Sequence, residues 1–276
     1  MPKGWLIYYE EDYQKNRAFA DQFTARCGEF GLELELKLAD DLMPEMPPKG
    51  LPDFAVNRSR DALLAHWLES SGCRVFNSAM VCETCNDKAR THLLAHSLGL
   101  PQVDMAFLRN NSASLRTHGL GYPVVVKAPG GHGGGEVLLA HSEEELLRVA
   151  QALPGGRLVL QRLCGAPGVD VRVYVLGGKV LAAVRREAQD GFRANLSLGG
   201  TVRPYALKDT EKQMVLALAD ALRPDYIGID FLMDADGSLR FNEAEDAVGS
   251  RALYQLGGFD VVGLYLQHIA ESLRKR

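Results

Sequence analysis

A glycine-rich stretch from Tyr122 to Ala140, YPVVVKAPGGHGGGEVLLA, constrains this chain more than any other segment. Three consecutive β-branched residues, Val124 to Val126, predict a short buried strand that ends at Lys127. Five glycines between positions 130 and 135 then leave a loop almost bare of side chains, and the apolar run 137–140 returns the chain. The stretch therefore predicts a hairpin whose amide groups can close over an anion such as a phosphate, with the lysine beside it.

Two better-known phosphate-binding motifs do not fit this loop. A Walker P-loop places Lys-Ser or Lys-Thr after its last glycine and before a helix, whereas here Lys127 precedes the glycines and a strand follows. A dinucleotide-binding Gly-x-Gly-x-x-Gly pattern breaks at His132 or at Glu136 in the two registers available. A surface hairpin without a ligand remains the alternative for the glycine run taken alone.

Length and charge narrow the class of protein. A chain of 276 residues exceeds the usual size of one domain and predicts two or three domains that share an interface. Its net charge of −4, with both signs interspersed, argues against a nucleic-acid partner, because such proteins carry a basic surplus. The amino terminus resembles no signal peptide, and no run approaches the roughly eighteen apolar residues that span a bilayer. We therefore expect a soluble cytoplasmic protein without a membrane partner.

The cysteines suit a reducing compartment. Cys82 and Cys85 have the spacing of half a zinc site or of a redox pair, but no second Cys-x-x-Cys follows. We expect no metal or redox role for them.

Residues 1–86 predict a small open α/β domain with a largely parallel sheet. Strands are expected at 5–9, 34–38 and 54–56, and helical spacing of apolar residues predicts helices between positions 12 and 30 and around 63–68. Three polar residues, Asn57, Arg58 and Arg60, follow the carboxyl end of a predicted strand, where ligands of open α/β sheets bind. An ordinary solvated loop explains each of them equally well.

Two further segments follow. Residues 87–163 predict a compact α+β lobe that could move as a lid, with helices at 88–98 and 142–153, the glycine hairpin, and strands at 103–108 and 158–163. Residues 164–276 predict sheet followed by helices, with hairpins at Gly177-Gly178 and at 234–237.

The second of these hairpins carries the acidic residues. A turn centred on residues 235–236 places Asp230 opposite Phe241. Glu243 is then a diagonal neighbour on the same face, and Glu245 follows two residues later, so three carboxylates converge. Crowded carboxylates are costly, and oxygen-ligated cations such as Mg²⁺ relieve that cost, although a solvated acidic strand end is the alternative. Alternation also predicts that the opposite face is buried, through Ile227, Ile229 and Phe231.

Taken in order, a series of short motifs resembles the ATP-grasp superfamily, most closely the branch typified by the ribosomal protein S6 glutamate ligase. The resemblance covers nearly all residues from about Val56 onward, while the first fifty are generic. The motifs are Ser59-Arg-Asp-Ala62, Asn86-Asp-Lys88, Val125-Val-Lys127 with its glycine loop, Leu158-Val-Leu-Gln161, Asp170-Val-Arg172, Arg193-Ala-Asn195 with Gly199-Gly200, Gly228-Ile-Asp230, and Glu243-Ala-Glu245 before Gly249. Their order is more specific than any one of them.

The resemblance implies a three-lobed ATP-grasp architecture with an N-terminal open α/β sheet domain and ATP between the central and C-terminal lobes. It also implies two divalent ions, Mg²⁺ or Mn²⁺. The implied contacts are Lys88 and Lys127 to phosphates; Gly133, Gly134 and Gly135 over them; Gln161, Arg162 and Leu163 at a hinge beside adenine; Asp170 to the ribose; Arg193, Ala194 and Asn195 on the phosphate and metal side; and Asp230, Glu243 and Glu245 to the metals. Two departures stand out: the hinge lacks the usual acid and aromatic after Gln161, and Glu245 replaces the usual asparagine.

The activity implied is that of an ATP-dependent carboxylate–amine ligase, which phosphorylates a carboxylate to an acylphosphate and lets an amine displace phosphate. Metal ions and basic side chains neutralise the transferring phosphoryl group. Arg172 and Arg193 are the catalytic candidates, because a guanidinium binds oxyanions bidentately. Arg251 is a candidate for a substrate carboxylate, or else a surface arginine.

The substrates implied are small molecules, amino acids, or peptide and protein termini. The sequence leaves open whether the chain forms a homo-oligomer. A small-molecule kinase of the same fold and a non-catalytic nucleotide-binding module are the alternatives to a ligase.

Overall fold

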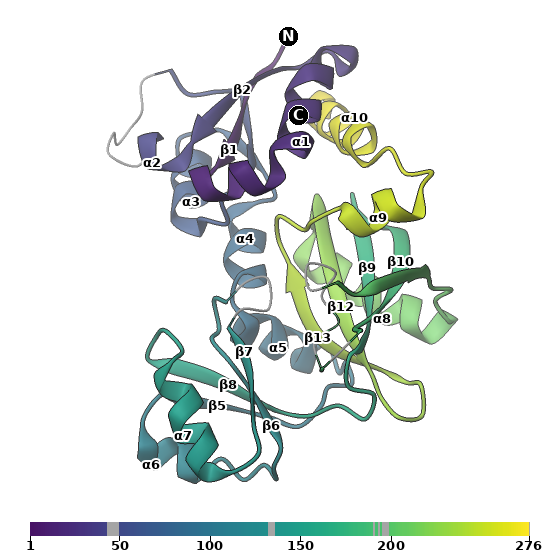
Figure 1. The fold of residues 1–276 in the computed structure, drawn as a ribbon. Helices are drawn as coiled ribbons and strands as arrows, with labels where there is room; N and C mark the ends of the chain where they lie inside the picture. The colour runs from purple at the N-terminus through teal and green to yellow at the C-terminus, as the bar shows by residue number, and fades with distance from the viewer. Residues whose placement is uncertain (43–49, 132–135, 190, 193, 195–198, 276) are drawn as a thin grey trace.

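The strands of the described residues form three sheets, and helices pack against each of them (Figure 1). The computed structural model describes residues 1–42, 50–131, 136–189, 191–192, 194 and 199–275. Strands and helices alternate through the first part of the chain, which confirms the predicted α/β class. Within the described residues, no helix is both long enough and apolar enough to cross a membrane.

The N-terminal sheet is parallel throughout, with the strand order β2-β1-β3-β4. Its strands are β1 (Lys3–Tyr8), β2 (Glu33–Leu38), β3 (Phe54–Asn57) and β4 (Arg74–Phe76). Parallel neighbours need crossover connections, and these contain α1 (Glu10–Arg26), α2 (Ala39–Leu42) and α3 (Ala62–Ser70). The predicted sheet is confirmed, and Asn57 ends β3 at its carboxyl edge.

The helix predicted between residues 12 and 30 is divided in the structure. It ends at Arg26, and Cys27–Phe30 continue as a 3₁₀ turn. Gly31 closes this turn with a φ of 72°, a left-handed conformation that glycine adopts at little cost. Asn16 also interrupts α1, because its φ of −118° and ψ of 16° are not helical. The apolar spacing that predicted one helix therefore spans a kinked helix and a tighter last turn.

The central sheet is antiparallel, with the order β5-β8-β6-β7. Its strands are β5 (Met105–Arg109), β6 (Val124–Lys127), β7 (Val137–Ala140) and β8 (Arg157–Arg162), and its helices are α6 (Ser112–Arg116) and α7 (Glu143–Gln151). The predicted hairpin forms as expected, with Val124 opposite Ala140 and Lys127 opposite Val137. Ser142 caps α7 by accepting from the Glu145 amide, which explains where this helix begins.

The C-terminal sheet is antiparallel, with the order β11-β10-β9-β12-β13. Its strands are β9 (Val169–Leu176), β10 (Lys179–Glu187), β11 (Thr201–Pro204), β12 (Tyr226–Met233) and β13 (Leu239–Glu245). One face packs under α8 (Asp209–Leu222) and buries Ile227, Ile229 and Phe231, as predicted. The helices α9 (Arg251–Leu256) and α10 (Val261–Arg274) follow.

Two helices connect the N-terminal sheet to the central one. They are α4 (Ala79–Cys85) and α5 (Lys88–Ser97). The helix α5 begins at Lys88, as predicted, with Asp87 as its cap, and it packs against β13 of the C-terminal sheet. We keep the division into residues 1–86, 87–163 and 164–276 as a proposal.

The register of the β12–β13 hairpin differs from the predicted one. The prediction paired Asp230 with Phe241, whereas Asp230 lies opposite Glu243. The turn is centred on Asp236, and Asn242 bulges out of β13 as one extra residue. Each change shifts the pairing by one residue, so simple alternation predicts the wrong partner. Phe241 turns instead into the core beneath α8.

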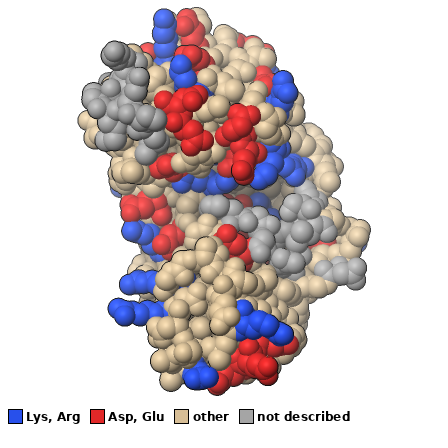
Figure 2. Space-filling model, turned by 60° about the vertical axis from the view of Figure 1, so that its left-hand side comes forward, with Lys and Arg blue, Asp and Glu red and all other residues tan. Residues whose placement is uncertain are grey.

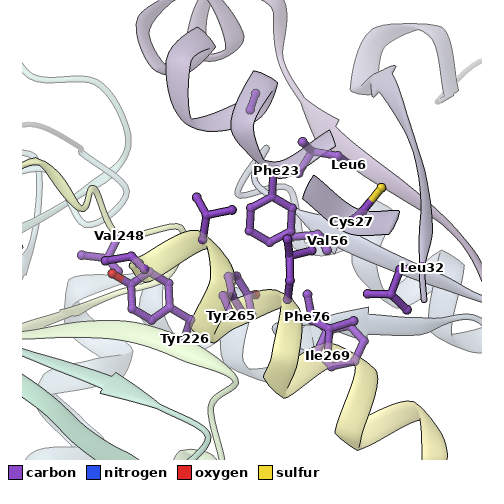
Figure 3. Packing of buried hydrophobic residues seen from close by; sticks show 14 of the residues in the cluster. Leu6, Phe23, Cys27, Leu32, Val56, Phe76, Tyr226, Val248, Tyr265 and Ile269 are labelled. Atoms are coloured by element: carbon purple, nitrogen blue, oxygen red, sulfur yellow. The ribbon is translucent and has the colours of Figure 1, made fainter. Parts of the chain in front are cut away.

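One hydrophobic cluster joins the N-terminal sheet to the C-terminal lobe (Figure 3). Phe23 of α1 meets Tyr265 of α10 edge-on, with ring centroids 5.5 Å apart. Tyr226 of β12 lies 5.3 Å from the same tyrosine ring. Because elements from both ends of the chain share this core, the two parts are packed as one body.

A polar contact beside this cluster holds the same two parts together. Asn77, which is 3% exposed, accepts from the amides of Asp225 and Tyr226 at 2.6 and 2.9 Å. Its amide nitrogen donates to Asp246 at 2.6 Å. Arg74 adds an ion pair with Asp225 at 2.7 Å. Buried polar groups such as these cost stability when their partners are removed.

We expect Asn77→Ala to lower the free energy of unfolding by about 2 kcal/mol, because it leaves two buried backbone N–H groups without an acceptor. Urea denaturation measures this change. Gln213→Ala, at an exposed position of α8, is the matched control and should change it by no more than about 0.5 kcal/mol. Equal stabilities of the two variants would show that Asn77 does not hold the interface.

Candidate active site

A cavity of about 300 Å³ lies where the three parts of the chain meet. On the face in Figure 2, Lys and Arg side chains gather in a band at the waist of the molecule, beside a hollow. The predicted site residues that line the cavity are Lys88, Lys127, Gln161, Arg162, Leu163, Asp170, Arg172, Ala194, Asp230, Glu243 and Glu245. The remaining ones, Gly133, Gly134, Gly135, Arg193 and Asn195, lie outside the described residues.

The floor of the cavity is the sheet face opposite α8. Successive side chains of a strand alternate between faces, and this places Arg172 of β9 directly across from Asp230 of β12. The two form a bidentate pair, with Nε and Nη2 of Arg172 at 2.6 Å from the carboxylate oxygens. Arg186 of β10 lies across from Asp170 of β9, and this pair is also bidentate, at 2.6 and 2.7 Å. Arg186 further donates to Asp230 at 2.7 Å, so the four charges form one connected row.

The bulge in β13 completes this face. Without the extra residue, Asp230 and Glu243 would not be direct neighbours; with it, Asn242 and Glu243 both contact cavity side chains. Glu245 follows at the end of β13 and accepts from Nη2 of Arg172 at 2.8 Å. The bulge therefore brings the predicted carboxylates together by a different pairing from the one expected.

Two lysines approach the carboxylates from other elements. Lys127, at the end of β6, is 5% exposed and donates to Oδ1 of Asn242 at 2.8 Å. Lys88, in the first turn of α5, donates to the carbonyl of Gly131 and lies 3.3 Å from Glu243. The glycine hairpin and the acidic strand are thus linked through both lysines.

Burial and neighbouring charges set the protonation of these groups. Burial raises the pKa of Asp230, but Arg172 and Arg186 outweigh it and lower the pKa to about 2. Burial also favours a raised pKa at Glu243, yet Lys88 and Lys127 lower it overall. The pKa of Glu245 is raised, because burial outweighs the attraction of Arg172. Burial lowers the pKa of Lys127 to about 8, and the like charge of Lys88 adds to this.

The residues present fit a divalent cation. Asp230, Glu243 and Glu245 each offer a carboxylate oxygen within 4.8 Å of the others, and Mg²⁺ prefers such oxygen ligands. Nearby cations already balance the acids of this face: the four carboxylates Asp170, Asp230, Glu243 and Glu245 face the four bases Lys88, Lys127, Arg172 and Arg186. Divalent ions held by these acids would supply counter-charge for a triphosphate bound beside them.

The hinge residues line the cavity in different ways. Gln161 is 1% exposed, and its amide nitrogen has no hydrogen-bond partner among the described residues. Arg162 instead points outward, with its guanidinium 3.5 Å from Asp104. Both oxygens of Asp170, the predicted ribose contact, accept from Arg186. The nucleotide roles of these residues stay predictions.

Sequence reasoning missed two members of this face. Arg186 binds two carboxylates, but the Gly177-Gly178 hairpin alone would pair Arg185 with Asp170. An irregularity between Val180 and Ala182 shifts the register by one residue and places Arg186 there instead. Asn242, the partner of Lys127, likewise had no signal, because only the bulge turns it into the cavity.

The cysteines of the Cys-x-x-Cys segment lie in α4. Both are buried, and burial, with the negative charge of Asp246, raises the pKa of both thiols. A raised pKa disfavours the thiolate form, which is the form that binds metals and reacts with disulfides.

The family model described as a RimK-like ATP-grasp domain matches residues 85–269. The human N-acetylaspartylglutamate synthase A is 29% identical over 97% of this chain and 70% of its own length. The β-citrylglutamate synthase B of Danio rerio is also 29% identical, over 97% of this chain and 68% of its own length.

A solved structure of similar fold is a RimK domain ATP-grasp protein from Sphaerobacter thermophilus, with a TM-score of 0.76 at 17% identity over 98% of each chain. This likeness confirms the predicted ATP-grasp architecture. With the family match and the curated relatives, it favours the ligase prediction over the two alternatives. The chain belongs to the RimK-like ATP-grasp family and is an ATP-dependent carboxylate–amine ligase.

Proposed function

We propose that this ligase binds ATP with two Mg²⁺ ions in the cavity and joins a small carboxylic acid to the amine of an amino acid. The observation that carries the proposal is the meeting of Asp230, Glu243 and Glu245 with Lys88 and Lys127, which come from different elements, at one buried place. Three carboxylates suit divalent ions, and two lysines beside them suit phosphates.

Each side chain has a proposed task in phosphoryl transfer. Bound Mg²⁺ supplies charge neutralisation for the phosphoryl oxygens. Lys88 and Lys127 hold the phosphates, and Arg186 keeps Asp230 oriented by donating to its carboxylate. Arg172 uses Nε and Nη2 on Asp230 and Nη2 also on Glu245, so we assign its Nη1 to the oxygens of the acylphosphate.

The amine step needs no side-chain nucleophile. The acylphosphate is already an activated acyl group, so the incoming amine attacks the carbonyl carbon and phosphate leaves with the bonding electrons. The pocket must exclude water, since water would hydrolyse the same intermediate. We propose that the glycine hairpin, whose residues 132–135 lie outside the described residues, covers the phosphates during this step.

The names of the relatives guide the choice of substrates. Both curated relatives carry names of synthases whose products contain glutamate. Our proposal for this chain is therefore a small acid as acyl donor and an amino acid as amine, in preference to a protein terminus. ADP-release screening of acids paired with amino acids, with product masses recorded, tests it. Amine-dependent ADP release with a product of amide mass is expected, and release of ADP without an amine would instead indicate a kinase.

We expect Lys127→Ala to weaken ATP binding by about 1.5–3 kcal/mol, or roughly ten- to a hundredfold, because it removes a charged hydrogen-bond donor to the phosphates. Calorimetric titration with MgATP measures this. Lys212→Ala, at an exposed position of α8, is the control and should leave affinity unchanged. Unaltered affinity in Lys127→Ala would remove this lysine from the phosphate site.

The wild-type affinity for ATP should also depend on pH. Lys127 loses its proton as the pH rises through about 8, so the enzyme binds ATP more weakly above that pH. Arginine stays charged over this range, and Lys127→Arg should therefore show a flatter profile between pH values below and above 8. Parallel pH profiles in the two proteins would contradict the assignment.

Two variants of β13 test the cation site. Glu245→Asn keeps an oxygen ligand and should retain turnover with a higher Mg²⁺ requirement, because it removes one charge from the cluster. Glu243→Gln should lower turnover about a hundredfold or more, since it removes the carboxylate that pairs with Lys88 and lies opposite Asp230. The rate is measured against Mg²⁺ concentration. Asp236→Asn, in the exposed turn of the same hairpin, is the control, and identical Mg²⁺ curves in all three would exclude the cluster from catalysis.

A further inference from the structure

The central sheet borders a second cavity, of about 690 Å³, which shares no described lining residue with the candidate active site. It lies between the end of β5, the start of β8 and the base of the glycine hairpin. We call it the loop cavity and define it by Arg109, Pro129, Gly130, Gly155, Gly156 and Arg157. The phosphoryl transfer proposed above uses none of these residues.

Two arginines lie directly opposite each other at the loop cavity. Arg109 of β5 is the cross-strand partner of Arg157 of β8, and both side chains are exposed. The Asn110 amide donates to the Gly156 carbonyl at 3.0 Å, so the arginines one position earlier form a non-hydrogen-bonded pair. In such pairs the side chains lie closer together than in hydrogen-bonded ones. Like charges in this arrangement destabilise a sheet.

The other end of the same two strands shows the compensated arrangement. There the Arg162 amide donates to the Asp104 carbonyl at 2.9 Å, and the Arg162 guanidinium lies 3.5 Å from the Asp104 carboxylate. Within the described part of the chain, neither Arg109 nor Arg157 has a carboxylate partner. Glu136 lines the loop cavity but forms no ion pair with either of them. An anion between the two guanidinium groups would remove the repulsion, because each group would then have a negative partner.

Much of the remaining wall is bare backbone. Asn110 fixes the loop between α7 and β8 by donating to the last turn of α7 at 3.0 Å and to the Gly155 carbonyl at 3.5 Å. A Cβ added at Gly155 or Gly156 would meet no atom within 4 Å, so both glycines border open space. The amides of Gly130, Gly155 and Gly156 have no acceptor among the residues that the structure describes. Free amides beside basic side chains are typical of anion-binding sites.

We propose that the loop cavity binds a phosphate-bearing small molecule, with Arg109 and Arg157 on the phosphate oxygens and the glycine amides completing the contacts. A guanidinium pairs bidentately with phosphate. Two of them match the double charge of a phosphate monoester, which presents three acceptor oxygens at one point. A cavity of several hundred Å³ accommodates such a ligand.

This ligand is separate from the nucleotide. Pro129 and Gly130 line the loop cavity, whereas the next residue, Gly131, lines the active-site cavity. The two sites are therefore neighbours along the chain, and an assay of the loop cavity must keep the active site filled.

The test follows the Nε–Hε signals of the arginine side chains by ¹H–¹⁵N NMR during titration with glycerol 3-phosphate. Mg²⁺ and a non-hydrolysable ATP analogue saturate the active site, and the ionic strength is held constant. The pH is kept above the second pKa of the phosphate ester, about 6, so that the ligand carries two charges. We expect the signals of Arg109 and Arg157 to shift together with one dissociation constant, while the signal of Arg148 stays unchanged. Arg148 is the internal control, because it lies on α7 and pairs with Glu145 at 3.4 Å outside the loop cavity.

Three variants assign the binding to these side chains. Arg109→Gln and Arg157→Gln should each weaken binding about tenfold, read at the arginine that is kept, because each removes a charged donor. Both positions are exposed, so neither substitution disturbs a packed core and either one decides alone. Arg148→Gln is the matched control and should leave the affinity unchanged.

Glutarate tests the chemical class of the ligand. It is also a dianion, but its two charges lie on separate carboxylates, so we expect it to bind about fivefold or more weakly than glycerol 3-phosphate. Equal affinity for the two anions would overturn the assignment to phosphate. Equal shifts at Arg109, Arg157 and Arg148 would indicate general screening of surface charge and overturn the site itself. An unchanged dissociation constant in Arg109→Gln and Arg157→Gln would do the same.

Discussion

The candidate active site depends on a buried row of alternating charges that crosses three strands. Asp170, Arg186, Asp230 and Arg172 bond to one another in sequence across β9, β10 and β12. A buried charge is costly when it stands alone, so the loss of one member would leave its neighbour unpaired. Because the sheet fixes the spacing of all four, the carboxylates are oriented before any ligand enters. Glu245 adds one more negative charge beside this row. That charge is also paired, because the Glu245 carboxylate accepts from Arg172.

The lysines extend this balance beyond the sheet. Lys88 and Lys127 reach the acidic strand from α5 and from the central hairpin, and the like charge of Lys88 adds to burial in lowering the pKa of Lys127. A phosphate placed beside Lys127 would favour the charged form of this lysine. The positive charges of the two lysines therefore favour an anion at the point where the central hairpin meets β13.

Sequence reasoning succeeded where a short-range pattern determines the structure. Alternation predicted the buried face with Ile227 and Ile229, and the glycine run between two apolar segments predicted the central hairpin. It failed where two local irregularities combine to change a strand register. The shifted turn and the bulge together make Glu243, and not Phe241, the cross-strand neighbour of Asp230. The carboxylates that we predicted do converge, because the bulge turns Asn242 and Glu243 toward the cavity together. Contacts between distant segments, such as Arg60 with Asp12, left no pattern to find.

Such contacts between distant segments explain how the first fifty residues can lack recognisable motifs and still help to shape the cavity. The phosphate chemistry requires particular residues at fixed positions, and these make up the motifs that resemble the family. A substrate pocket needs only shape and charge, which many sequences supply. The core shared by Phe23, Tyr226 and Tyr265 fixes α1 against the C-terminal lobe. Substitutions on α1 can therefore shift the loop that carries Arg60, through the ion pair of Arg60 with Asp12, without moving the carboxylates of β12 and β13.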